Sequence, residues 1–185
     1  MIKVALYGRP GAGKSTFGVS LGQEFMAAGV PVVPLKLAAP LYTLQAVVHV
    51  FAGRPLLGPG QQDGLLLNDL AGHLRRINSA ALTDPFARRV IQAAEKHPGG
   101  VVVCDDMRAP DVEVLVELGF LLVEVWAPER VRQARKQARG DLSPGADDHV
   151  TELPPDCVPH HRVINDGGLE QLQGRAAELV REVMP

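Results

Sequence analysis

The sequence of 185 residues contains little cysteine, few aromatic side chains and no long apolar run. Two cysteines make no disulfide framework, so we expect a protein of the reducing cytoplasm. Aromatic residues make up 4%, which disfavours the stacking platforms that bind single-stranded nucleic acid. No uncharged stretch approaches the ~20 residues that span a bilayer, and the apolar run at 2–7 is too short for a signal peptide.

An excess of charge of one sign is also missing. Nineteen Lys and Arg oppose 21 Asp and Glu, which gives a formal net charge of −2. Proteins that bind nucleic-acid polymers usually carry a strongly basic face, so this balance disfavours that class. The composition is 46% hydrophobic and 22% charged, as in ordinary globular proteins, and the length fits one domain. We therefore expect small-molecule partners, with no membrane and no nucleic-acid polymer.

Short apolar runs alternate with helical patterns, which predicts an α/β fold with a parallel sheet flanked by helices on both faces. The expected strands cover residues 4–7, 30–35, 101–105, 120–126 and 162–164. The expected helices cover residues 15–28, 41–51, 66–77, 84–98, 110–118, 129–139 and 169–183. Three helical segments separate the second strand from the third, more than one crossover requires. We interpret part of residues 39–97 as an inserted substrate-binding segment.

The strongest motif lies between the first expected strand and the first expected helix. Residues 8–15 match G-x-x-x-x-G-K-[ST], the P-loop pattern. Glycines let main-chain N–H groups close around phosphate oxygens, Lys14 places a charge near the transferred phosphate, and Ser15 offers a hydroxyl to Mg²⁺. The N-terminus of the helix adds its positive dipole end. The motif predicts a loop that holds a triphosphate.

Two acidic residues end the clearest buried strand. A carboxylate from Asp105 or Asp106 at this position can hold Mg²⁺ or its water shell, as P-loop proteins require. One of the two could instead cap the helix that follows. Arg108 is expected in the same cleft, where its planar fork suits phosphate oxygens.

Further arginines form pairs along the expected helices. Arg135 and Arg139 share one helical face, and we favour a functional role for both. The other cations of that helix are interpreted as a solvated surface: Arg130, Arg132 and Lys136. Two adjacent pairs in the inserted segment could bind a second anion or lie on the surface: Arg75 with Arg76, and Arg88 with Arg89.

A group of histidines and one cysteine invites a zinc interpretation: His149, Cys157, His160 and His161. Their spacing matches no closed structural zinc set, so we favour ordinary loop residues. Cys104 lies within an expected strand and is interpreted as part of the core.

Four short motifs, in this order, resemble the bacteriophage-type deoxynucleoside monophosphate kinases over nearly the whole chain. They lie at residues 8–15, 36–41, 106–111 and 164–167. The stretch 149–152 is also similar to a His-x-Ser-Glu segment of that family. In the family pattern Asp-x-Arg-x-Pro-Asn, however, Asp111 takes the place of the Asn and Ala109 replaces the usual aromatic residue.

The resemblance implies a three-layer P-loop kinase fold with a helical insert that binds the acceptor and a short lid. The implied core covers residues 1–38, 98–131 and 161–185, the insert about 39–97 and the lid about 132–160. The implied reaction is ATP-dependent, Mg²⁺-assisted, in-line phosphoryl transfer to a (deoxy)nucleoside monophosphate, giving the diphosphate.

The resemblance also implies roles for residues that match the motifs. Asp106 and Arg108 would face the transferred phosphate, and Asn165 would lie near the adenine of ATP. The implied catalytic residues are Lys14, Arg108, Asp106, Arg135 and Arg139. The implied ATP-binding residues are Gly8, Gly11, Ala12, Gly13, Lys14, Ser15, Thr16 and Asn165. The implied acceptor-binding residues are Lys36, Arg75, Arg76 and Arg88. The implied metal ligands are Ser15, Asp105 and Asp106.

Two other functions remain open. A dephospho-coenzyme A kinase has a similar small P-loop fold with lid arginines and a late Asn-Gly stretch. A guanine-nucleotide switch is less favoured, because the sequence has no Asn-Lys-x-Asp motif and no Asp-x-x-Gly after the acidic strand end. The accepted base and the oligomeric state also stay open, and the inserted helices could form a homodimer surface.

Overall fold

The computed structural model describes residues 1–58, 61–143, 153 and 155–184. Its centre is a five-stranded sheet in the order β2-β3-β1-β4-β5, in which every pairing is parallel. The strands are β1 (Ile2–Tyr7), β2 (Val32–Pro34), β3 (Val101–Cys104), β4 (Leu121–Trp126) and β5 (His161–Ile164). The predicted α/β class with a parallel sheet is confirmed.

Helices follow the strands as the apolar periodicity predicts. They are α1 (Lys14–Ala27), α2 (Ala39–Phe51), α3 (Gly64–Ile77), α4 (Thr83–Lys96), α5 (Val112–Glu117), α6 (Glu129–Arg139) and α7 (Leu169–Val183), with a short 3₁₀ turn η1 (Ala109–Asp111) before α5. β2 is shorter than the expected strand at 30–35: it begins after Pro31, which has no N–H to donate to a neighbouring strand, and it ends at Pro34. α4 begins before Asp84, which lies in the first turn and not at the expected N-cap.

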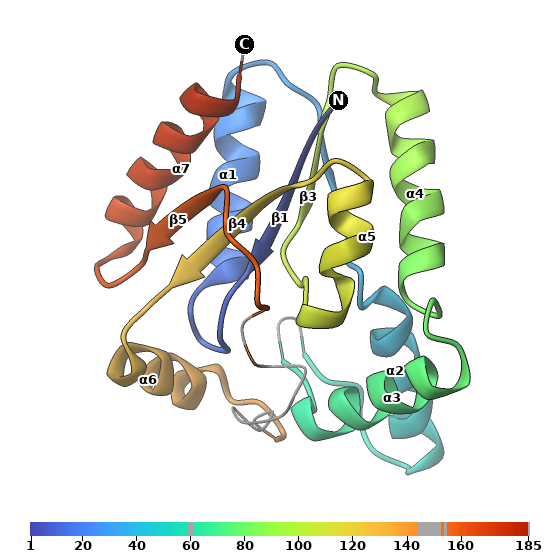
Figure 1. Ribbon diagram of the computed structural model, residues 1–185. Coiled ribbons are helices and arrows are strands. Elements are labelled where there is room, and N and C mark those ends of the chain that lie inside the picture. Colours follow the sequence, from blue (N-terminus) through green and yellow to red (C-terminus); the bar gives the residue numbers. More distant parts are fainter. Residues whose placement is uncertain (59–60, 144–152, 154, 185) are drawn as a thin grey trace.

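The sheet separates two apolar clusters, because successive strand residues point to opposite faces. On one face, Val4 and Leu6 of β1 pack in a cluster with side chains of α1 and α7. On the other face, Ala5 and Tyr7 pack in a cluster with side chains of α4 and α5. The result is a three-layer arrangement of helices, sheet and helices (Figure 1).

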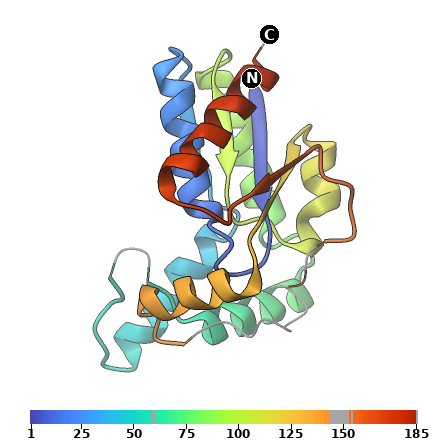
Figure 2. The ribbon, with the colours of Figure 1, turned by 90° about the vertical axis from the view of Figure 1, so that its left-hand side faces the viewer.

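α2, α3 and α6 lie beyond the carboxyl ends of the strands (Figures 1 and 2). α2 and α3 pack against each other, and α6 follows β4 on the other side of this end of the sheet. α4 also lies between β2 and β3 in the sequence, as α2 and α3 do. Unlike them, it packs on the sheet, and its Phe86 and Val90 belong to the core. Among the described residues, no helix combines the length and apolar character needed to cross a membrane.

Candidate active site

The loop between β1 and α1 is shaped by glycines. Gly11 and Gly13 have positive φ angles of 79° and 95°, a conformation that L side chains rarely adopt. A Cβ at Gly11 would lie 2.5 Å from the carbonyl oxygen of Arg132, and one at Gly13 would lie 2.2 Å from Asn165 Nδ2. Two segments beyond β4 therefore pack so closely on the loop that only glycine fits.

The start of α1 offers polar groups to an anion. The N-cap residue Gly13 has no side chain to occupy the first N–H groups of the helix, which leaves them available to phosphate oxygens. Lys14 Nζ donates to the carbonyl oxygen of Gly8 at 2.7 Å, so the lysine is folded over the loop. Ser15 and Thr16 are exposed at the cavity that this loop borders.

One cavity of about 610 Å³ lies against this loop. Its cationic lining comes from the loop, the strand ends, α3 and α6: Lys14, Lys36, Arg75, Arg108, Arg135, Lys136 and Arg139. Its apolar lining comes mainly from α2 and α3: Leu37, Ala38, Leu41, Tyr42, Leu67, Ala71 and Leu82. Three acidic residues also border it: Asp105, Asp106 and Asp111. The cavity thus combines cationic, acidic and apolar lining residues.

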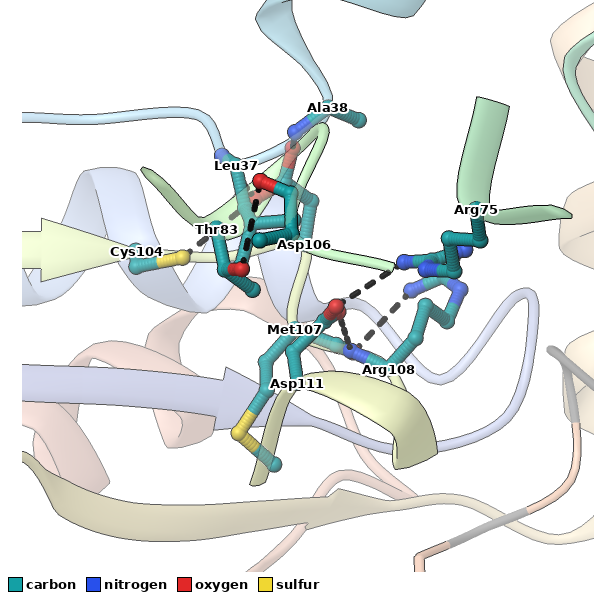
Figure 3. Close-up of polar contacts among 10 residues, drawn as sticks. Leu37, Ala38, Arg75, Thr83, Cys104, Asp106, Met107, Arg108 and Asp111 are labelled. Atoms are coloured by element: carbon teal, nitrogen blue, oxygen red, sulfur yellow. Dashed lines mark hydrogen bonds and ion pairs between the residues drawn. The ribbon is translucent and has the colours of Figure 1, made fainter. Parts of the chain in front are cut away.

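The two acids that follow β3 have different partners. Asp106 is buried, and its two carboxylate oxygens accept hydrogen bonds from the main-chain N–H groups of Leu37 at 2.8 Å and Ala38 at 3.0 Å (Figure 3). The thiol of Cys104 also donates to Asp106 at 3.3 Å. Asp106 therefore holds the segment after β2 in place.

Asp105 pairs with a lysine at the cavity wall. Lys36 Nζ lies 2.6 Å from Asp105 Oδ1 and 2.7 Å from Oδ2, with the lysine side chain 44% exposed and the aspartate 13%. Burial opposes the charge of Lys36, but the hydrogen bond and the negative charge of Asp105 outweigh it and raise the lysine pKa. Lys36 is therefore a cation held beside the strand-end carboxylate.

A second ion pair joins α3 to the turn after β3. Arg75 Nη2 lies 2.8 Å from Oδ1 of Asp111, whose side chain is fully buried (Figure 3). The other oxygen of Asp111 accepts from the main-chain N–H of Arg108 at 2.9 Å. Burial raises the pKa of Asp111, and the positive charge of Arg75 offsets only part of that effect.

An arginine of α6 connects the loop between β1 and α1 to the loop after β5. Arg135 donates to Asn165 Oδ1 at 3.2 Å and to the main-chain oxygens of Asn165 and Gly167. Asn165 Nδ2 in turn donates to the carbonyl oxygen of Ala12 at 2.7 Å. Asn165 does not line the main cavity, but it fixes the loop that does.

The chain after α6 is held to the loop before α3. The main-chain N–H of Gly64 donates to the carbonyl oxygen of Ser143 at 3.0 Å, and that of Gln62 donates to Asp141 Oδ1 at 3.2 Å. The Ser143 hydroxyl also donates to the side chain of Asp63. Arg139, which lines the cavity, pairs with Asp141. Residues 140–143 are thereby hydrogen-bonded to residues 61–65 at the rim of the cavity. We call this contact the clasp.

Some residues singled out in the sequence lie elsewhere. Arg76 and Arg88 are exposed and do not line the cavity. The adjacent Arg89 instead donates from Nη2 to the carbonyl oxygen of Lys36 at 2.7 Å. The sequence motifs predict no role for Asp111, although Asp in place of the Asn of the resembled pattern is the signal that points to one.

The histidines near the end of the chain have protein partners. His160 Nδ1 accepts from the main-chain N–H of Leu122 at 3.0 Å, and His161 Nδ1 lies 3.2 Å from Glu182 Oε2. Residues 149–152, which include His149, fall outside the described residues.

The oxygen donors at the cavity suit a Mg²⁺ ion bound together with phosphates. Among the residues that the structure describes, no three His, Cys, Asp or Glu side chains gather to hold a metal by themselves. Kinase sites, however, usually hold Mg²⁺ by one or two protein oxygens plus substrate phosphates and water. Ser15 offers such an oxygen, and Asp105 offers one once the half-exposed Lys36 side chain moves off its carboxylate. Asp106 instead accepts hydrogen bonds at both oxygens from main-chain N–H groups, which the fold holds in place.

Comparison with solved structures finds kinases of this architecture. The APS kinase of Mycobacterium tuberculosis, in complex with AMPPNP and APS, matches with a TM-score of 0.56 at 16% identity over 97% of each chain. A sugar kinase from Janibacter matches with a TM-score of 0.52 at 17% identity, over 99% of this chain and 96% of that chain. A gluconokinase from Sinorhizobium meliloti matches with a TM-score of 0.50 at 19% identity, over 98% of this chain and 93% of that chain.

No protein-family model matches the sequence, and no curated protein matches it. At identities below 20%, the structural likeness establishes the architecture. The chain shares the fold of these P-loop kinases, as the resemblance implies.

Proposed function

We propose that the protein transfers the γ-phosphoryl group of ATP to a (deoxy)nucleoside monophosphate. The observation that carries this proposal is the single cavity in which a P-loop meets a second set of cations. The P-loop and Lys14 suit the phosphates of the donor. Arg75 and Arg108 lie at the same cavity and supply charge for an acceptor that is itself an anion.

The apolar lining residues of the cavity support a nucleotide acceptor. Leu41 and Tyr42 of α2 and Leu67 and Ala71 of α3 line it, and such surfaces suit the faces of a planar base. A sugar acid offers hydroxyl groups on all sides and would need polar partners there. The apolar side chains thus favour a base with a monophosphate, and the polar lining residues Gln62 and Asn68 can meet the edge of that base.

The chemistry asks little of the protein beyond placement and charge. The acceptor monophosphate already carries a nucleophilic oxygen, so no strong base is required. In our proposal, Lys14 moves from the Gly8 carbonyl to the transferred phosphoryl group, and Arg108 and Arg135 neutralise charge around it. Mg²⁺, held by Ser15 and Asp105, would neutralise phosphate oxygens when bound.

We further propose that the clasp at the rim serves the reaction. Residues 132–160 would act as a lid, and α2 and α3, within the segment 39–97, would act as the acceptor-binding insert, whereas α4 of that segment packs in the core. A lid that meets the insert excludes water, which would otherwise take the phosphoryl group in place of the acceptor. The contacts between residues 140–143 and 61–65 support this role.

A coupled assay of ADP release, across a panel of ribo- and deoxynucleoside monophosphates, tests the proposal. We expect turnover with at least one monophosphate and little ADP release without an acceptor. The panel should include dephospho-coenzyme A, APS and gluconate. Turnover with one of these alone would replace the proposed acceptor, and no acceptor-dependent turnover at all would refute kinase activity of this type. ATP and GTP affinities from calorimetry would separately decide the guanine-nucleotide alternative.

A further inference from the structure

Asp111 has no role in the proposed reaction, yet it is the most deeply buried charged side chain at the cavity. Its side chain is fully buried, and its two oxygens face two different donors. One donor is the Arg75 guanidinium of α3, and the other is the main-chain N–H of Arg108 (Figure 3). Asp111 therefore ties the helical insert to the turn that follows β3.

This arrangement requires a carboxylate. A carboxylate accepts hydrogen bonds at both oxygens, whereas an Asn amide has one acceptor oxygen and one donor nitrogen. An Asn at position 111 could satisfy Arg108 or Arg75, but its NH₂ group would face the other donor. The Asp found here, where the related family pattern has Asn, thus fits the presence of Arg75 opposite it.

The ion pair leaves most of the Arg75 fork available. A guanidinium has five N–H donors in a fixed plane, and Asp111 takes a hydrogen bond from one nitrogen. Arg75 and Arg108 both line the cavity, so two like charges face one space. The negative charge of Asp111, 2.8 Å from Arg75, reduces the repulsion between these two cations.

We propose that Asp111 is a positioning residue for the acceptor phosphate. It holds Arg75 so that the outer edge of the guanidinium faces the same part of the cavity as Arg108, and the two arginines together bind the phosphate of the acceptor. This inference rests on the proposed function, because it assigns that function's acceptor phosphate to a particular pair of arginines.

Steady-state kinetics of Asp111→Asn test the inference. We expect the KM for the monophosphate to rise about tenfold, as loss of one oriented charged contact does, while the KM for ATP changes less than about twofold. The effect should depend on Arg75: in an Arg75→Met background, Asp111→Asn should raise the KM further by less than about twofold. An equal rise in both backgrounds would overturn the inference.

Two variants guard against effects on folding alone. Glu178→Gln removes a carboxylate from an exposed ion pair with Arg175 on α7, and it should leave both KM values unchanged. If Asp111→Asn does not fold, Arg75→Lys tests the same geometry. A lysine can still pair with Asp111 but has no planar fork for a second anion, so the KM for the monophosphate should rise alone. An unchanged KM would contradict the inference.

A measurement without turnover separates this inference from the proposed function. The Nε–H signal of Arg75 in a ¹⁵N NMR spectrum is assigned by its loss in Arg75→Lys. We expect Asp111→Asn to shift and broaden that signal, because the guanidinium loses its fixed partner. If the wild-type protein turns over no monophosphate, the proposed function fails, and the signal alone decides whether Asp111 positions Arg75. An unchanged signal in Asp111→Asn overturns the positioning.

Discussion

The two adjacent acids after β3 should respond differently to the same substitution: Asp106→Asn should lose more stability, and Asp105→Asn should lose more turnover. The carboxylate of Asp106 accepts hydrogen bonds from the main-chain N–H groups of Leu37 and Ala38. In Asp106→Asn, one of these two N–H groups loses its acceptor oxygen and faces the NH₂ group of the amide. A buried donor without a partner costs about 1–3 kcal/mol, and the remaining hydrogen bond loses about 1 kcal/mol of charge assistance. We expect the free energy of unfolding to fall by about 2–4 kcal/mol.

For a chain of this size, that loss lowers the midpoint of thermal unfolding by roughly 4–16 °C. Asp105→Asn instead breaks a pair with Lys36, whose side chain is 44% exposed. Pairs of that kind contribute at most about 1 kcal/mol, so the midpoint should change by less than about 4 °C. Calorimetry of both variants, with urea unfolding as a second measure, checks the difference.

Turnover should fall more in Asp105→Asn than in Asp106→Asn. Asp105 offers its carboxylate to Mg²⁺, so Asp105→Asn should lower Mg²⁺-dependent turnover by about 10- to 100-fold. Asp106→Asn, assayed well below its own unfolding midpoint, should lose less activity than Asp105→Asn. A stable Asp106→Asn protein with the larger loss of turnover would refute the assignment of Asp106 to the structure and Asp105 to the metal.

Three further outcomes follow from the geometry of the site. Lys14→Ala should lower turnover by at least about 10²–10³-fold and leave the unfolding midpoint of the ligand-free protein nearly unchanged, whereas normal kcat would remove Lys14 from the mechanism. Gly11→Ala, with its Cβ 2.5 Å from a carbonyl oxygen and φ at +79°, should destabilise the protein by at least about 1–2 kcal/mol in urea unfolding and weaken ATP binding in calorimetry. Asp63→Ala, which removes an acceptor of the Ser143 hydroxyl, should raise acceptor-independent ADP release relative to transfer; an unchanged ratio would count against the lid.

Much of the fold could be predicted because its signals are local. The apolar run of β3 and the helical periodicity of α7 are each contained in a few consecutive residues, and both elements form where expected. Element ends were less predictable. The segment expected as one helix at 110–118 divides into η1 and α5, with Asp111 held at the junction by contacts that local periodicity does not encode.

The candidate site was likewise predictable only where its residues are contiguous in the sequence. The P-loop is contiguous, so its residues could be identified from spacing alone. Arg75 and Asp111 are 36 residues apart, and Asp106 and Leu37 are 69 apart, so their pairing depends on how α3 and the strand ends meet in space. Tertiary structure also determines which of the adjacent arginines of α4 makes a contact near the site. Arg89 donates to the carbonyl oxygen of Lys36, whereas Arg88 lies on another side of the helix.

The most direct test follows the phosphoryl group itself. With γ-labelled [³²P]ATP and each monophosphate of the panel, the label should appear in a nucleoside diphosphate for the wild-type protein and fail to appear for Lys14→Ala. Label recovered only as inorganic phosphate, or moved equally by the Lys14→Ala protein, would contradict transfer from a P-loop donor to a nucleotide held in the same cavity.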